Sequence, residues 1–190
     1  MRTVIISLSL MFLAFAANAE NMQLNVEKSK VTWQGSKVGG SHNGNIQFQK
    51  GNIILEGGDL AGGTFIMDMS SITNNDLSGG MRDRLVNHLK SDDFFSVEKF
   101  PTSKFEITEV SREAEGSYEI TGNITIKGIT EEITFPARFK KNGDAFEAST
   151  SITLDRSKFD VRYGSASFFD DLGDRMIYDD FDLEMELVFE

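Results

Sequence analysis

The chain contains no cysteine, which excludes disulfide bonds, thiol nucleophiles and thiolate metal sites together. Its stability must therefore come from packing and from backbone hydrogen bonds, and the usual lipid-attachment residue of exported proteins is missing. Proline is almost absent as well, since only Pro101 and Pro136 occur. Both lie near the ends of expected strands, where a missing N–H group disturbs the hydrogen-bond ladder least.

Histidine is scarce, and its two copies, His42 and His88, do not form the H-x-x-x-H spacing of a zinc site. No G-x-S-x-G elbow marks a nucleophilic serine. The carboxylates between Asp170 and Asp182 do not follow the D-x-D-x-D-G spacing of a calcium loop, which favours a solvated acidic loop over a calcium site. We therefore expect no catalytic residue, no bound metal and no cofactor.

The chain has fewer basic than acidic residues. The chain carries 19 Lys and Arg residues against 30 Asp and Glu residues, for a formal net charge of −11. A field of this sign repels the phosphates of nucleic acids and the surfaces of anionic membranes. We expect neither nucleic-acid binding nor docking to an anionic membrane through a basic face.

Only the N-terminus holds a long apolar run. Val4–Ala17 follows the positive Arg2 and is shorter than the roughly 20 residues of a membrane-spanning helix. Ala17-Asn18-Ala19 is a small-x-small cleavage site, so the sequence predicts a signal peptide over 1–19 and one mature domain over 20–190. We expect a periplasmic protein without a stable membrane anchor. The alternative, an uncleaved anchor, is disfavoured by the well-formed cleavage site.

The rest of the chain alternates apolar and polar residues with a period of two. In Tyr118–Lys127 and Phe181–Phe189 every second side chain is apolar or glycine, which is typical of strands with one wet face. Turn signals such as Asn142-Gly143 separate these runs. One segment, Gly80–Ser91, has the spacing of a short amphipathic helix. The pattern predicts an all-β fold, a single up-and-down antiparallel barrel of about eight strands, with a short helix and loops near one end.

A barrel of this size either fills with side chains or holds one small ligand. The expected inward positions carry large flat or flexible groups, which suit an adaptable apolar pocket. Two pairs of adjacent rings, Phe94-Phe95 and Phe168-Phe169, lie outside the expected strands, where both rings of a pair can fold over an opening. These pairs favour a carrier of an apolar ligand. The alternative is a ligand-free structural or stress-related protein with a solid barrel core.

Several short motifs follow one another along the chain: Trp33 with Lys37–Gly44, Asp68–Ile72, His88–Phe95 with Phe100-Pro101, Gly122–Thr130, and Asp155-Arg156 with Val161–Ser165. In this order and spacing they resemble the YceI-like family of polyisoprenoid-binding, lipocalin-like periplasmic proteins. The resemblance implies an eight-stranded barrel with an apolar channel. It also implies a long-chain lipid or isoprenoid ligand, of the polyisoprenoid, isoprenoid quinone or fatty amide type, that is bound or transported in the periplasm.

On this sequence the resemblance places the apolar lining of the channel at Trp33, Phe48, Met67, Phe94, Phe95, Phe105, Ile120, Phe135, Phe168 and Phe169. His88 and Arg156 are the candidates for the ligand's polar head group. Arg156 has a structural alternative, an ion pair with Asp155. A third hypothesis, a hydrolase or isomerase acting on a bound lipid, would need His88 with Asp92 or Asp93. An exported barrel could form a homodimer, although no residue argues for it.

Overall fold

The computed structural model describes residues 19–190, which form nine strands, one α-helix and three short 3₁₀ turns. The strands are β1 (Ala19–Gln23), β2 (Lys30–Lys37), β3 (Gly40–Glu56), β4 (Asp59–Asp68), β5 (Thr102–Ala114), β6 (Ser117–Ile126), β7 (Ile129–Asn142), β8 (Ala145–Asp155) and β9 (Ile177–Phe189). The helix is α1 (Gly79–Lys90), and the turns are η1 (Met69–Ser71), η2 (Arg156–Phe159) and η3 (Gly173–Arg175). The predicted signal peptide lies outside the described residues except for Ala19, the first residue of β1.

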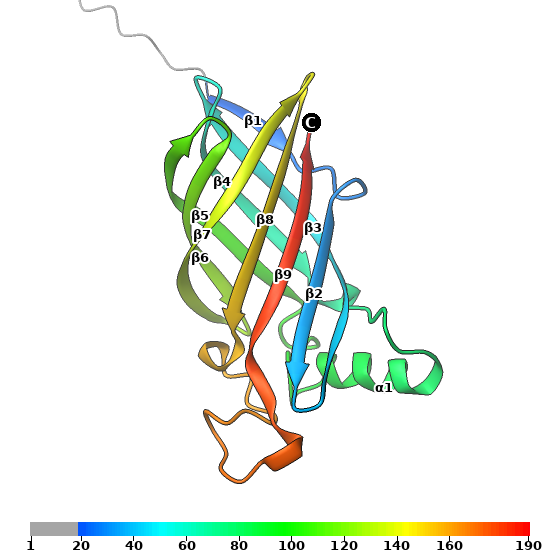
Figure 1. The fold of residues 1–190 in the computed structure, drawn as a ribbon. Coiled ribbons are helices and arrows are strands. Elements are labelled where there is room, and N and C mark those ends of the chain that lie inside the picture. The colour runs from blue at the N-terminus through cyan, green and yellow to red at the C-terminus, as the bar shows by residue number, and fades with distance from the viewer. Residues whose placement is uncertain (1–18) are drawn as a thin grey trace, which may run out of the picture.

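Strands β2 to β9 form a closed antiparallel barrel in which each strand pairs with its neighbours in the sequence (Figure 1). The ring closes where β9 pairs with β2 and where β3 pairs with both β2 and β4. The predicted up-and-down barrel of about eight strands is confirmed. Its cause is the alternation of apolar and polar side chains, which forces one face of every strand into a shared interior.

The extra strand β1 completes the barrel wall beyond the start of β2. It pairs with the second half of β3, and Gln23 exchanges two backbone hydrogen bonds with Glu190 just after β9. These bonds measure 3.0 and 2.9 Å between N and O. β1 and β2 thus share one place in the wall, between β3 and β9.

The two ends of the barrel differ. At one end short hairpins join β3 to β4, β5 to β6 and β7 to β8, and the C-terminus lies there too (Figure 1). Gly143 has a φ of +65°, which suits the two-residue turn between Asn142 and Ala145. The opposite end carries α1 and the long connection from β8 to β9, and it is called the α1 end below.

The helix spans Gly79–Lys90, one residue from the range that its periodicity predicts. Leu89 is buried and Leu85 packs against the core, so the apolar side of α1 faces the barrel. The chain then makes a compact turn, in which the N–H of Phe95 donates to Leu89 O and that of Val97 donates to Lys90 O. This turn buries the ring of Phe94 and holds it close to the helix.

Candidate ligand-binding cavity

The barrel interior is not packed solid. It encloses a cavity of about 390 Å³, within the range of about 300–1,000 Å³ that small-molecule sites occupy. All eight barrel strands contribute residues to its lining, as do α1 and the connections at the α1 end. Several inward side chains, among them Met67, Phe105 and Leu183, are only half-buried because they border this cavity.

The wall of the cavity is almost wholly apolar along the strands. Phe105 packs at 5.4 Å between ring centroids against Phe135 and covers Gly122, where a Cβ atom would lie 2.5 Å from the Phe105 ring. Glycine at this position of β6 therefore gives the Phe105 ring room to lie flat against the sheet. Such a wall suits hydrocarbon and offers few polar contacts.

Packed aromatic rings fill the barrel at the end away from α1. Phe189, which has no exposed surface, lies 6.1 Å from Phe65 and 6.4 Å from Phe139 between ring centroids. Tyr118 packs edge-on against Phe139 at 5.5 Å. The cavity borders Phe65 and Phe139 but not Phe189, so this cluster forms its floor.

At the α1 end the cavity is bordered by aromatic and polar side chains. The ring centroids of Phe94 and Phe95 lie 5.3 Å apart with the ring planes at 65° to each other, and the Phe95 ring lies 6.5 Å from that of Phe181 of β9. His88 packs edge-on against Tyr163 at 4.3 Å and against Phe94 at 5.7 Å. Both phenylalanines of the turn after α1 therefore border the cavity at its polar end, as a lid would.

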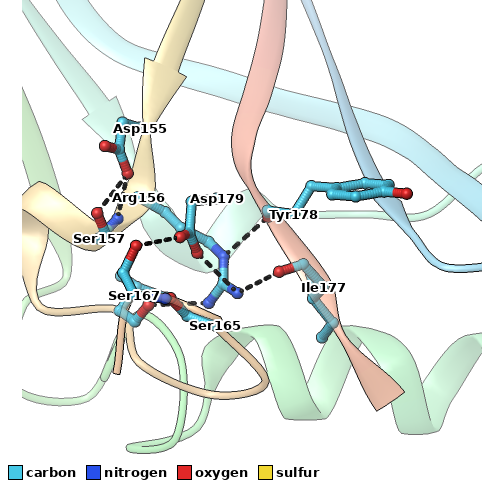
Figure 2. Close-up of polar contacts among 9 residues, drawn as sticks. Asp155, Arg156, Ser157, Ser165, Ser167, Ile177, Tyr178 and Asp179 are labelled. Atoms are coloured by element: carbon cyan, nitrogen blue, oxygen red, sulfur yellow. Dashed lines mark hydrogen bonds and ion pairs between the residues drawn. The ribbon is translucent and has the colours of Figure 1, made fainter. Parts of the chain in front are cut away.

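Arg156 lies in the wall at this end with only 2% of its surface exposed, and Figure 2 shows that its guanidinium is held by the protein itself. Nε donates to Tyr178 O at 3.2 Å, Nη1 to Val161 O at 2.8 Å and Nη2 to Ile177 O at 3.0 Å. Nη2 also lies 3.3 Å from Asp179 Oδ1. Arg156 thereby joins the end of β8 to the start of β9.

The contacts of Arg156 correct one expectation from sequence. Its ion-pair partner is Asp179, whereas Asp155 accepts hydrogen bonds from the N–H and Oγ of Ser157 and so caps η2. Burial lowers the pKa of the guanidinium, and the nearby carboxylates of Asp179 and Asp155 oppose this shift. Backbone carbonyls accept hydrogen bonds from all three nitrogens of the guanidinium, so Arg156 has a structural role at this end, while its contact with a ligand head group stays a prediction.

His42, the other histidine, also borders the cavity at the α1 end. Its Nδ1 atom lies 2.7 Å from Asp76 Oδ2, and because an ionised carboxylate only accepts, Nδ1 donates. Burial acts to raise the pKa of Asp76, but hydrogen bonds from the Asn43 N–H, from His42 and from the Asn74 amide outweigh it and lower the pKa to about 2. Sequence reasoning missed Asp76, which lies 34 residues from His42.

The structure does not bring Phe168 and Phe169 to the cavity. Their side chains are 39% and 49% exposed, and both backbone N–H groups donate to Ser165 O, which turns this loop outward. The guanidinium of Arg162 covers the ring of Phe168 at 5.0 Å. The predicted lining is therefore corrected at these two positions.

The other predicted lining residues come together around the cavity. They are Trp33, Phe48, Met67, Phe94, Phe95, Phe105, Ile120 and Phe135, and His88 and Arg156 border it as well. Whether these side chains touch a ligand stays a prediction. Sequence reasoning did not include Ile133, Phe139, Leu183 and Tyr163 in the lining. The alternation of apolar and polar residues along β7 and β9 indicates that the first three side chains face inward. Tyr163 lies in a loop, where no such periodicity predicts the direction of a side chain.

Two further features are absent from residues 19–190. No helix of this part of the chain is long and apolar enough to cross a membrane. No three acidic or histidine side chains gather there as a metal site would need.

A closed eight-stranded antiparallel barrel around an apolar cavity defines a lipocalin-like architecture. The family model of the YceI-like domain matches residues 22–189. The chain therefore belongs to the YceI-like family, which confirms the resemblance drawn from its motifs.

Solved structures share this fold. BcnA of Burkholderia cenocepacia superposes with a TM-score of 0.71 at 22% identity, over 87% of this chain and 98% of that one. A polyisoprenoid binding domain from Saccharophagus degradans, implicated in plant cell wall breakdown, gives a TM-score of 0.65 at 9% identity, over 89% and 97% of the two chains.

Relatives by sequence are UPF0312 proteins. That of Photorhabdus laumondii is 35% identical over 104 residues, which is 50% of this chain and 52% of the relative. One from Pseudomonas aeruginosa is 38% identical over 88 residues, or 42% and 46% of the two chains. The chain spans about half the length of the curated relatives it matches.

Proposed function

We propose that the protein binds a long apolar or amphiphilic lipid chain inside the barrel. The observation that carries this proposal is the apolar cavity of about 390 Å³ between the aromatic floor and the α1 end. The name of the related polyisoprenoid binding domain from Saccharophagus degradans points the same way. A polyisoprenoid, an isoprenoid quinone and a fatty amide are the ligand types that we propose.

The free energy of such binding comes from burying the ligand's methylene groups against the apolar wall. Each buried methylene contributes about 0.8 kcal/mol, while association costs about 4–15 kcal/mol of lost translational and rotational freedom. A chain of about ten methylenes therefore only begins to offset that cost, and longer chains bind usefully. This is why an apolar channel needs few polar contacts and favours long ligands.

The asymmetry of the cavity supports one orientation of the ligand. The floor is a cluster of packed rings around Phe189, whereas the polar side chains His42, His88 and Lys37 border the cavity at the α1 end. We therefore place the tail against the floor and the head group near α1. Phe94 and Phe95 then cover the ligand between its tail and its head group.

Binding is favoured over catalysis by the surroundings of His88. Its Nε2 atom lies 4.0 Å from Asp93 Oδ2, beyond hydrogen-bond distance, and the Asp93 side chain is 70% exposed. A carboxylate in water at this separation orients the imidazole poorly. The imidazole instead packs against the rings of Tyr163 and Phe94. We propose no catalytic residue.

The proposed place of action rests on the N-terminal sequence. The predicted signal peptide supports export to the periplasm, where a soluble carrier could move lipid between membranes. Both localisation and transport are proposals. Fractionation of the native host, with detection of the chain after cleavage at Ala19, tests the first; recovery of the uncleaved chain with membranes would overturn it.

Trp33 provides a direct assay of binding, because it is the single tryptophan of the chain and borders the cavity. Its Nε1 atom donates to Thr73 O at 3.0 Å, so the indole is fixed in place. Titration of delipidated protein with long-chain isoprenoid alcohols should change Trp33 fluorescence in a saturable way. An unchanged spectrum, together with no retention of ligand on gel filtration, would favour the ligand-free alternative.

A further inference from the structure

Ser103 is a polar residue of the cavity wall at the α1 end. It lies at the start of β5, pairs with Met67 of β4, and stands two residues before Phe105 on the same face of the strand. All three side chains border the cavity. Ser103 is only 9% exposed, so its hydroxyl faces the interior rather than the solvent outside the barrel.

The hydroxyl of Ser103 makes no hydrogen bond with any of residues 19–190. The other buried polar side chains of this range are all bonded: Asn74, Ser96, Arg156 and Ser165. Its oxygen is not fully buried, so it is open to the cavity, where a ligand or water can complete its hydrogen bonds. Ser103 therefore offers the cavity a hydrogen-bonding group that no other residue of 19–190 occupies.

Charge in the wall limits what can bind beside this hydroxyl. Arg156, the buried charged residue of the described chain, is already matched by Asp179. Lys104 borders the cavity, but its ammonium group pairs with Glu106 on the exposed face of β5. Lys37 also borders the cavity, but it is exposed. An ionised head group placed at Ser103 would therefore lose its hydration without gaining a buried counter-charge, which is costly.

We propose that Ser103 anchors the polar head of the ligand inside the channel, and that this head is a neutral group such as an alcohol, an amide or a carbonyl. The hydroxyl donates to a carbonyl oxygen, or it accepts from an O–H or N–H group of the ligand. This inference rests on the proposed binding of a lipid chain. It adds the chemical class of the head group and the residue that recognises it.

The test compares three probes of equal chain length: dodecane, dodecan-1-ol and dodecanoate, delivered from a cyclodextrin and followed through Trp33 fluorescence. Ser103→Ala should weaken binding of dodecan-1-ol about three- to tenfold and leave dodecane unchanged. Ser103→Thr, which keeps the hydroxyl, should restore most of the affinity. Ser111→Ala is the matched control, because Ser111 lies exposed on the same strand and bonds only Glu113.

The outcomes separate the two proposals. If none of the probes binds the wild-type protein, and longer isoprenoid alcohols do not bind it either, the lipid channel itself is wrong. If dodecane and dodecan-1-ol both bind but Ser103→Ala changes neither, the hydroxyl is completed by water and the anchoring role is overturned. If dodecanoate binds the wild-type protein most tightly and Ser103→Ala weakens it as much, the neutral class of head group is overturned.

Discussion

A substitution at Ala148 should shorten the channel from its closed end. Ala148 is a small inward residue of β8 that pairs with Leu187 of β9 and Phe139 of β7, beside the aromatic floor. A larger side chain here, as in Ala148→Trp, would extend into the space next to the floor. The head-group end, on the far side of the cavity, would keep its contacts.

The expected result is a change in the dependence of affinity on chain length. In the wild-type protein each added methylene should strengthen binding about fourfold, because it adds about 0.8 kcal/mol of burial, until the chain reaches the floor. In Ala148→Trp the same slope should hold for short chains, but the affinity should stop rising at a shorter chain. Affinity for the shortest binding alcohol should stay the same.

Calorimetric titration with a series of straight-chain alcohols measures this dependence. Ser149→Trp is the control, since Ser149 is the next residue along β8 and is exposed outside the barrel. Its chain-length series should follow that of the wild-type protein. An equal loss of affinity at every chain length in Ala148→Trp would refute the orientation of the ligand, with its tail at the floor.

The remaining predictions concern the lid, the wall and the rim. Phe95→Asp should abolish uptake of long chains, because it places a carboxylate between Phe94 and Phe181, and retained Trp33 fluorescence changes would count against the lid. Arg156→Met should destabilise the fold by about 3–5 kcal/mol in urea unfolding, because it leaves Asp179 buried without its partner; a loss below about 1 kcal/mol would contradict that role. The low pKa of Asp76 stabilises the fold above the unfolded-state pKa of 3.8, and this contribution, at most about 2 kcal/mol, should disappear as the pH falls from about 4 to about 2. Acid unfolding of Asp76→Asn should lack that component, and an unchanged pH profile would show that the hydrogen bonds to Asp76 do not act in this way.

The sequence predicted the barrel well because a strand that buries one face must alternate. The run from Phe181 to Phe189 shows this plainly: Phe181, Leu183, Met185 and Leu187 border the cavity, as their alternation indicated. The helix was placed to within one residue by the spacing of Leu85 and Leu89. Local periodicity thus determines which side chains face inward.

Contacts between distant segments could not be predicted in the same way. The pairs Arg156–Asp179 and His42–Asp76 join residues whose neighbours in sequence carry no matching pattern. Their partners follow from the closure of the barrel and from the path of its loops. Phe168 and Phe169 show the same limit, because a loop has no period that tells inside from outside.

For Ser103 the sequence predicts the inward orientation of the side chain, but not the lack of a hydrogen-bond partner. Its position two residues before Phe105 marked it as inward, by the same alternation that placed Phe105 in the wall. That its hydroxyl has no partner in the described chain emerges only when the neighbouring strands are in register. Polar residues at inward positions of a predicted barrel are therefore worth examining as ligand contacts before the structure is known.

Native mass spectrometry of the protein purified from its own host tests the central claim most directly. Binding of a lipid in the channel predicts a discrete adduct that disappears after organic extraction, whose mass identifies the chain and a neutral head group. Refilling the extracted protein with that lipid should then change Trp33 fluorescence. A single mass equal to that of the polypeptide, with no response of Trp33 to isoprenoid alcohols or fatty amides, would contradict the account.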